Sequence, residues 1–339
     1  MSRATGTQEH RAVPRLGRSL SVVGLGTWQL GADWGRVDEE EALGVLRGAY
    51  AAGTTFFDTA DVYGDGRSER LIGRFLRELG RDGAGAGAVC VATKAGRRGV
   101  QDPAQFTLGN LRAWTDRSRS NLGVDTLDLV QLHCPPTPVF SSAAVYDALD
   151  TLVEEGRIAA YGVSVETCEE ALAAIARPHV ATVQIILNVF RRRPLEEVLP
   201  AAAEAGVGVI ARVPLASGLL SGRYRHDTVF APDDHRAYNR HGESFDVGET
   251  FSGVGYANGV AAAAEFAALA PAGASPAQTA LRWVLQQPGV TTVIPGARNV
   301  EQARANAAAA QLPPLPDGTL RALEALYDDR VRAEVHHRW

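Results

Sequence analysis

Short apolar runs alternate with longer segments of helical periodicity along the chain. The runs are apolar at consecutive positions, which is typical of parallel strands that are buried on both faces. Eight of them are expected to be strands: 21–25, 54–58, 89–94, 127–133, 158–164, 181–184, 208–212 and 290–295. Eight segments with helical spacing follow these strands in turn: 38–52, 68–79, 107–122, 142–155, 167–176, 195–205, 276–287 and 300–309.

This alternation indicates repeated βαβ units. Eight units in 339 residues fit a (β/α)8 TIM barrel, and a doubly wound sheet is the alternative. Residues 13–19 contain a turn with a glycine and could form a hairpin that closes one end of the barrel. We expect a single barrel domain over residues 12–339 and a disordered N-terminus over residues 1–11.

One long segment, residues 217–258, interrupts the alternation after the seventh strand. Structureless loops of this length are uncommon in compact domains and are usually functional lids. The segment leaves the carboxyl end of its strand, which is the face where barrels place their active sites. We therefore expect a long loop beside the active site.

The composition is that of an ordinary globular protein. Hydrophobic residues make up 45% and charged residues 22% of the chain, which excludes a disordered chain, a collagen and a coiled coil. No apolar run approaches the roughly 18 residues that span a bilayer, so no membrane partner is expected. The net charge of −5, without a basic stripe, argues against a nucleic-acid partner.

The cysteines and the N-terminus indicate a cytoplasmic protein. Cys90, Cys134 and Cys168 are widely spaced and form no CxxC motif, so neither a disulfide framework nor a metal site is expected. A reducing compartment fits this pattern best. The N-terminal residues are polar and lack the apolar core of a secretory signal.

Polar side chains stand where three of the expected strands end. Asp58 ends the second strand, Lys94 the third and His133 the fourth, and Tyr63 lies in the loop after Asp58. The carboxyl ends of barrel strands share one mouth, so these four side chains are expected to converge. A buried lysine beside a tyrosine favours the phenolate, and an aspartate keeps that lysine charged. The pattern predicts a tyrosine that exchanges a proton well below its ordinary pKa of about 10, with a histidine that positions a carbonyl oxygen.

Each of the four residues also has a structural interpretation. A strand-end aspartate often caps a turn, a tyrosine in a glycine-rich loop often packs on the surface, and a histidine can be a satisfied core residue. Lys94 is harder to explain in this way, because a fully buried lysine is rare unless it is paired. The presence of all four on consecutive βα units favours a catalytic group.

Beyond these residues, the chain strongly resembles the aldo-keto reductase superfamily over about residues 15–310, and most of all its bacterial stress-type and oxidoreductase branches. The segments that carry the resemblance are VGLGTWQLG (23–31), FFDTADVYGDGRSERLIG (56–73), VATKAG (91–96), SNLGVDTLDLVQLH (120–133), GRIAAYGVS (156–164), PLASGLLSGRY (214–224) and IPGARNVEQARAN (294–306). The resemblance implies a (β/α)8 barrel that binds NADPH, and the chain has no GxGxxG motif after a strand. It also implies that Tyr63 is the general acid, that Lys94 and Asp58 tune its pKa, and that His133 orients the substrate oxygen.

The resemblance further implies two groups of cofactor contacts near the reacting end. Ser164 and Gln184 match the positions that bind the nicotinamide carboxamide. Leu215, Ser217 and Leu220 lie in the loop that wraps the pyrophosphate, where small residues permit backbone contacts.

A third group lies at the start of the last βα helix. Arg298 matches the cation that binds the 2′-phosphate of NADPH, and Gln302 and Asn306 match positions at the adenine. A helix start with a guanidinium is a suitable anion site on physical grounds as well. Taken alone, Arg298 is more simply explained as a solvated helix-start residue, and the surrounding IPGxRxxxQ pattern favours the cofactor role instead.

Two positions depart from the family pattern and affect the nicotinamide end. Val165 stands where the family commonly has an asparagine, so one expected hydrogen bond to the carboxamide is missing. Arg212 and Val213 replace a common Tyr-Ser pair. We include Arg212 among the cofactor residues, because its guanidinium could stack on the ring or reach a phosphate.

Aromatic residues near the barrel mouth indicate a pocket for an apolar or flat carbonyl compound. The candidates are Trp28, Trp34 and Tyr224, with Phe230 as a further loop residue. Trp28 could equally belong to the core.

Three functions are therefore open at the level of sequence. The first is NADPH-dependent reduction of a small-molecule aldehyde or ketone to an alcohol, with the proton from Tyr63. The second is a cofactor-binding regulatory subunit that senses redox state for a partner protein. The third is a barrel isomerase or aldolase that uses Lys94 to form a Schiff base. The natural substrate and the oligomeric state are left open.

Overall fold

The computed structural model describes residues 8–31, 37–81 and 88–339. Its centre is an eight-stranded parallel sheet in which each strand pairs with the next along the chain. The strands are β3 (Leu25–Gly26), β4 (Phe56–Asp58), β5 (Cys90–Ala95), β6 (Leu129–His133), β7 (Tyr161–Ser164), β8 (Val180–Ile186), β9 (Gly208–Arg212) and β10 (Val290–Val293). Parallel bridges from Val23 to Val293 and from Gly26 to Gly296 join the first strand to the last. The predicted (β/α)8 barrel is therefore confirmed, and the doubly wound alternative is wrong.

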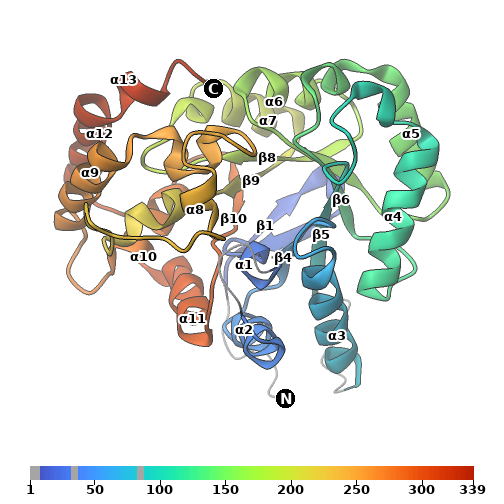
Figure 1. The fold of residues 1–339 in the computed structure, drawn as a ribbon, viewed down its shortest axis with the longest axis horizontal. Helices are drawn as coiled ribbons and strands as arrows, with labels where there is room; N and C mark the ends of the chain where they lie inside the picture. The colour runs from blue at the N-terminus through green and yellow to red at the C-terminus, as the bar shows by residue number, and fades with distance from the viewer. Residues whose placement is uncertain (1–7, 32–36, 82–87) are drawn as a thin grey trace.

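Helices surround the barrel, as Figure 1 shows. They are α1 (Trp28–Gly31), α2 (Glu39–Ala51), α3 (Arg67–Arg81), α4 (Leu108–Leu122), α5 (Ala143–Glu154), α6 (Cys168–Ile175), α7 (Val198–Ala205), α8 (His235–Tyr238), α9 (Tyr256–Ala268), α10 (Pro276–Leu285), α11 (Val300–Ala308), α12 (Asp317–Arg330) and α13 (Arg332–Val335). Several begin where the sequence carries a capping side chain: Thr167 and Ser275 each form a capping box, at α6 and α10 respectively. These caps satisfy backbone N–H groups that have no partner within the helix.

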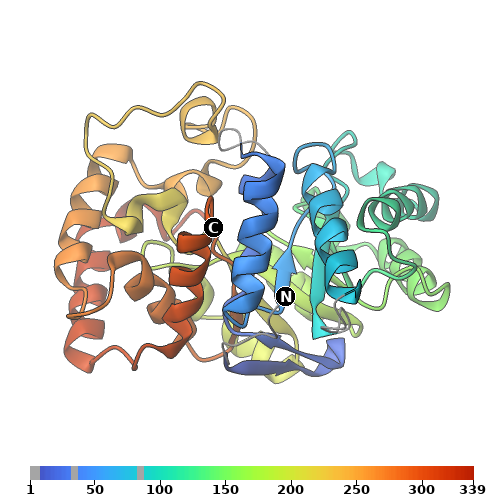
Figure 2. The same cartoon turned by 90° about the horizontal axis from the view of Figure 1, so that it is seen from below.

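The N-terminal hairpin closes the bottom of the barrel. Strands β1 (His10–Val13) and β2 (Arg18–Ser21) pair antiparallel, and Val13 and Leu20 pack with interior barrel residues such as Phe56. Figure 2 shows the hairpin and the region around α8 at opposite ends of the molecule. The expected hairpin at 13–19 is present but is longer, so the first barrel strand is shorter than the 21–25 expected.

The N-terminus expected to be disordered, residues 1–11, falls largely outside the described residues. His10 and Arg11, at its end, form the start of β1. At the other terminus, α12 and α13 were not expected, because the sequence interpretation ended its helices at residue 309.

The long segment after β9 is more structured than expected. It contains short helical turns at Ala216–Ser221, Val247–Glu249 and Phe251–Gly253, together with α8 and the first residues of α9. We call residues 246–253 the cover segment. The Ser217 hydroxyl donates to the Glu249 carbonyl (2.9 Å) and accepts from the Phe251 N–H (3.1 Å), so the cover segment is tied to the turn that follows β9.

The C-terminal residue, Trp339, packs against the cover segment and is hydrogen-bonded to it. The Trp339 indole N–H donates to Asp246 Oδ1 at 3.0 Å, and the Arg191 guanidinium lies 4.0 Å from the indole ring centre. Trp339 is only 5% exposed. A cation over a tryptophan face and a satisfied indole N–H both favour this buried position.

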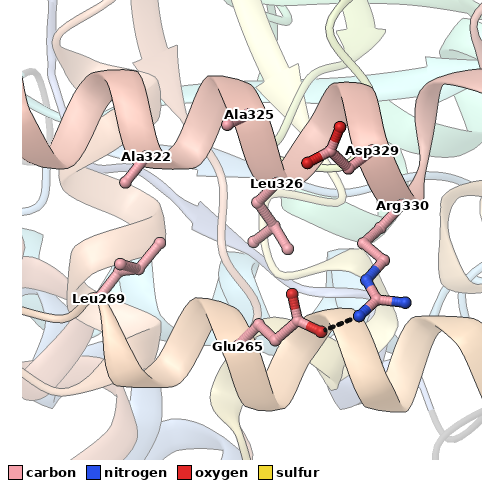
Figure 3. A pocket seen from close by; sticks show the side chains of 7 residues that line it. All are labelled: Glu265, Leu269, Ala322, Ala325, Leu326, Asp329 and Arg330. Carbon is pink, nitrogen blue, oxygen red and sulfur yellow. Dashed lines mark hydrogen bonds and ion pairs between the residues drawn. The ribbon is translucent and has the colours of Figure 1, made fainter.

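A hollow of about 510 Å³ lies between α9 and α12 (Figure 3). An ion pair between Glu265 and Arg330 closes one side of it. The hollow shares no residue with the site described below. Within the described residues, no helix has the length and apolar character needed to cross a membrane.

Candidate active site

Strand alternation places polar side chains at the upper end of the barrel interior. Successive residues of a strand point to opposite faces, so residues two apart share a face. Phe56 and Ala92 belong to the apolar interior of the barrel. Asp58 and Lys94 follow them by two positions on β4 and β5, so their side chains also point inward, one layer nearer the mouth.

These side chains form one hydrogen-bonded group with Tyr63. The Lys94 ammonium donates to the Asp58 carboxylate, to the Thr59 carbonyl at 3.0 Å and to the Tyr63 hydroxyl at 3.4 Å. The His133 ring meets the Tyr63 ring edge-on, with 5.9 Å between their centres. The structure therefore brings together the four residues that the sequence predicted as a catalytic group.

The charge states of this group follow from burial. Lys94 is 1% exposed, and burial alone would lower its pKa, but the Asp58 carboxylate and the Tyr63 oxygen together outweigh burial and raise the pKa above its ordinary value. Burial raises the pKa of Tyr63, and the attraction of Lys94 offsets only part of this effect. The expectation of a tyrosine with a lowered pKa is therefore wrong for this structure, in which Tyr63 is a protonated phenol. Burial, together with the charge of Arg97, lowers the pKa of His133 well below its usual value, so its ring is neutral.

The second oxygen of Asp58 is held by two amides. Gln184 Nε2 donates to Asp58 Oδ2 at 2.7 Å, and Gln131 Nε2 donates to the same atom at 3.1 Å. Gln184 was predicted to bind the nicotinamide carboxamide, and in this structure its amide serves Asp58. Ser164 is buried beside this group, and its hydroxyl oxygen lies 3.5 Å from the Cys134 sulfur.

A buried charge cluster adjoins the group on its other side, and the sequence interpretation missed most of it. Arg97 Nη1 lies 3.5 Å from His133 Nε2 and donates to Glu249 Oε1 of the cover segment at 3.1 Å. Arg212 Nη2 donates to Glu166 Oε2 at 2.8 Å, and Arg212 Nη1 lies 3.8 Å from Glu249 Oε1. We call these four side chains, Arg97, Arg212, Glu166 and Glu249, the mouth cluster.

The two carboxyl groups of the mouth cluster differ in charge state. Burial raises the pKa of Glu166 to about 7, against the opposing pull of Arg212. The guanidiniums of Arg97 and Arg212 more than offset burial at Glu249 and lower its pKa. Glu249 is therefore a carboxylate, while Glu166 exchanges its proton near neutral pH.

Arg212, predicted as a cofactor contact, makes most of its hydrogen bonds within the protein through Nη2. Besides Glu166, its guanidinium donates to the Val165 carbonyl at 3.0 Å. A single sequence feature could have indicated this pairing: Glu166 lies two residues after the end of strand β7, so its carboxylate starts near the neighbouring strand ends.

The turn that follows β9 has an unusual backbone. Val213, Ala216, Ser217 and Gly218 all have positive φ values, between 47° and 96°. Such conformations are strained for residues other than glycine and are concentrated at functional sites. Leu215 accepts hydrogen bonds from Gly218 and Leu220 through its carbonyl, and the Leu220 side chain is fully buried. The residues predicted for the pyrophosphate thus form one tight turn at the mouth, in which the Ser217 hydroxyl is used by the cover segment.

The start of α11 has the features of an anion site. Arg298 is exposed, and its guanidinium forms no ion pair with a carboxylate of the described residues. Its backbone N–H donates to Gln302 Oε1 at 2.9 Å, and the Asn299 side chain caps the helix by accepting from the Gln302 N–H. Asn306 donates to the Gly296 carbonyl at 3.1 Å, which ties the loop to the helix. An unpaired guanidinium beside a helix start fits a phosphate group.

Aromatic side chains line the group at Tyr63. Trp28 stacks on the Tyr63 ring with 6.0 Å between centres and an 18° angle, and the rings of His235 and Phe245 flank Trp28 at 4.8 and 5.9 Å. His235 and Phe245 were not predicted. Trp34 lies outside the described residues.

Tyr224 and Phe230 lie in a different aromatic cluster. Their rings are 5.2 Å apart, and the Phe230 ring also packs on Phe251 and Tyr256. Arg236 donates to the Tyr224 hydroxyl. This cluster stabilises the long segment, so the structure gives Tyr224 a packing role there.

Comparison with known proteins agrees with the fold. The model of the aldo/keto reductase family matches residues 22–328. The Bacillus subtilis aldo-keto reductase YhdN is 30% identical over 302 residues, which cover 88% of this chain and 87% of that protein. The solved structure of aldo-keto reductase AKR11C1 from Bacillus halodurans, in its holo form, has a TM-score of 0.75 at 25% identity and covers 98% of this chain and 99% of its own.

A further solved structure, an aldo-keto reductase from Klebsiella pneumoniae in complex with NADPH, has a TM-score of 0.68 at 25% identity, with 96% of both chains covered. The barrel and these relatives define the class of the protein as an oxidoreductase. The chain belongs to the aldo/keto reductase family.

Proposed function

We propose that this protein reduces an aldehyde or ketone to the alcohol, with NADPH as the reductant and Tyr63 as the proton donor. The observation that carries the proposal is the contact of the Tyr63 hydroxyl with the buried Lys94 ammonium, itself fixed by Asp58. When bound, NADPH supplies the hydride to the carbonyl carbon.

The residues of the site have complementary roles in this reaction. Tyr63 holds its proton at neutral pH and gives it to the carbonyl oxygen as negative charge develops there. The Lys94 ammonium then stabilises the phenolate that remains, because it lies within hydrogen-bond distance of the tyrosine oxygen. The neutral His133 ring orients the carbonyl oxygen, and Trp28 forms the apolar wall beside it.

The residues that would hold NADPH are proposed from the family pattern and their positions in the barrel. The Klebsiella relative is a complex with NADPH, and this supports the same cofactor here. The exposed Arg298 would bind the 2′-phosphate, and Gln302 and Asn306 would lie at the adenine. Ser164 and Gln184 would meet the carboxamide, which requires Gln184 to share its amide between Asp58 and the cofactor.

The turn after β9 would wrap the pyrophosphate through Leu215, Ser217 and Leu220. Arg212 would act indirectly, because Glu166 already accepts a hydrogen bond from its guanidinium. Its contacts with Glu166 and Val165 fix the strand ends beside the proposed carboxamide site.

The charge state of Lys94 argues against the Schiff-base alternative. A Schiff base needs a neutral amine, whereas Lys94 donates to three oxygens and keeps its proton. Nothing in the described residues favours the regulatory-subunit alternative.

A small-molecule carbonyl compound is therefore the proposed substrate. The cytoplasm is the proposed location, in keeping with three unpaired cysteines.

The test is the variant Tyr63→Phe, which removes only the hydroxyl. We expect NADPH oxidation with a panel of aldehydes and ketones to fall by at least roughly 100-fold, because general acid catalysis supplies a factor of that order. NADPH binding, measured by fluorescence, should stay close to that of the wild type. Tyr256→Phe is the matched control, since its hydroxyl donates to the Arg225 carbonyl away from the site. Normal turnover by Tyr63→Phe would contradict the proposal.

A further inference from the structure

We propose that Arg97 is a specificity residue that binds an anionic group on the substrate, and that the preferred substrates are 2-oxo acids. This inference rests on the proposed function, because it names the substrate class of the same site. Arg97 was not among the residues predicted from sequence.

The first argument is the position of the guanidinium. Arg97 follows β5 through Gly96, whose φ of 107° bends the chain at the end of the strand. Its Nη1 lies 3.5 Å from Nε2 of His133, the residue proposed to orient the carbonyl oxygen. A carbonyl oxygen held by His133 would therefore lie within a few ångströms of a guanidinium.

The second argument is the state of the guanidinium. The Arg97 side chain is 24% exposed, whereas Glu249 is 8% exposed and Arg212 is 9% exposed. Its hydrogen bonds to other described residues all use Nη1. Its remaining N–H donors therefore stay available for a second acceptor, and a guanidinium binds carboxylates through two parallel hydrogen bonds.

The third argument is the charge balance at the mouth. Three guanidiniums and three carboxyl groups meet here: Arg97, Arg191, Arg212, Glu166, Asp246 and Glu249. Burial raises the pKa of Glu166 to about 7, so well below neutral pH it is mostly protonated. Lys94 and Asp58 offset each other as an ion pair. The described groups around His133 then hold more positive than negative charge, which favours an anionic substrate.

The fourth argument is that the protein already places a carboxylate on Arg97. Glu249, carried by the cover segment, accepts from Arg97 Nη1 at 3.1 Å. This contact demonstrates that a carboxylate fits against the guanidinium beside His133. Because Arg97 and His133 are so close, a carboxylate one bond from the carbonyl carbon can reach the guanidinium while His133 holds the carbonyl oxygen, which is the geometry of a 2-oxo acid.

The kinetic test compares phenylglyoxylate with its methyl ester, which differ in the charge next to the ketone. For Arg97→Gln we expect the ratio of kcat/KM for the acid to that for the ester to fall by about 10-fold to 100-fold, the range of a lost charge-assisted hydrogen bond. Arg97→Lys should restore part of the acid-to-ester ratio that Arg97→Gln loses. Glu249→Gln should raise the ratio above that of the wild type, because a carboxylate that competes for Arg97 is removed.

Arg98→Gln is the matched control. Arg98 is the next residue, but it pairs with Asp65 on the surface, so the ratio should stay as in the wild type. A ratio that changes less than twofold in Arg97→Gln, or that changes equally in Arg98→Gln, would overturn the assignment of Arg97.

A binding measurement separates this inference from the proposed function. Oxamate carries a carboxylate next to a carbonyl that is not reduced, and its affinity for the NADPH-loaded protein can be measured by calorimetry. Oxamate binding that weakens at least about 10-fold in Arg97→Gln supports the inference even if no carbonyl compound is turned over. Absence of oxamate binding to the wild type, alongside normal reduction of neutral aldehydes, refutes the inference and leaves the proposed function intact.

Discussion

Replacement of Asp61 by asparagine should stabilise the protein at alkaline pH. Asp61 lies in the turn after β4, two residues before Tyr63, and is 0% exposed. Neither carboxyl oxygen meets a donor in good hydrogen-bond geometry among the described residues. Burial, assisted by the nearby charge of Glu69, raises the pKa of Asp61 from 3.8 to about 7, although Arg98 and Arg117 oppose the shift. The folded protein therefore holds a proton that the unfolded chain releases.

The sign and size of the effect follow from this difference. Stability contributed by the raised pKa is fully present below pH 3.8, declines as the pH rises, and is lost above about 7. One pKa unit corresponds to about 1.4 kcal/mol, so a shift of about three units costs about 4 kcal/mol at pH 8. Asparagine cannot ionise, and its own desolvation cost does not change with pH. The difference in free energy of unfolding between Asp61→Asn and the wild type should thus grow by about 4 kcal/mol from pH 4 to pH 8.

Urea unfolding followed by circular dichroism at several pH values measures this difference. Asp227→Asn, which removes an exposed carboxylate, is the control and should run parallel to the wild type across the pH range. A difference for Asp61→Asn that stays flat, or that shrinks as the pH rises, would refute the reasoning. It would mean that the Asp61 carboxylate is charged and paired in the folded protein.

Two further predictions concern the proposed catalytic and cofactor residues. Arg298→Ala should raise the apparent KM for NADPH by about 10-fold or more and change that for NADH little, because only NADPH carries the 2′-phosphate; equal changes would contradict the assignment of Arg298. Lys94→Met should abolish carbonyl reduction and destabilise the fold by about 3–5 kcal/mol, since it leaves the buried Asp58 carboxylate without its cation. The double variant with Asp58→Asn should recover much of that stability in urea unfolding but none of the activity, and recovery of activity would argue against the role of Lys94.

The barrel could be predicted because its signal is repeated along the whole chain. Each strand is a continuous apolar run and each helix has its own periodicity, so eight independent patterns support the same fold. The register of the first strand could not be predicted in the same way. The apolar run predicted as one strand at 21–25 is divided in the structure: Ser21 pairs with the hairpin, and the barrel strand begins at Leu25. Only the packing of the hairpin beneath the barrel decides where one strand ends and the next begins.

The four residues at Tyr63 could be predicted because strand ends converge in any barrel. The mouth cluster could not, because Glu249 reaches Arg97 and Arg212 through a long segment whose path no local pattern defines. The pKa of Tyr63 was predicted in the wrong direction for a related reason. The sequence shows the lysine beside the tyrosine, whereas the extent of burial depends on Trp28, His235 and the residues packed above them.

The burial of Lys94 has a practical consequence. It is the only lysine among the 339 residues. All the other residues in the combined lysine and arginine count of 34 are arginines. Its three oxygen partners hold it in place, away from solvent. A protein labelled with isotopic lysine would therefore give one side-chain ammonium resonance, and that single line would report on the centre of the site. Amine-selective reagents would find no other lysine to modify, so the rate of their reaction at this position would measure how accessible the Lys94 amine is to solvent.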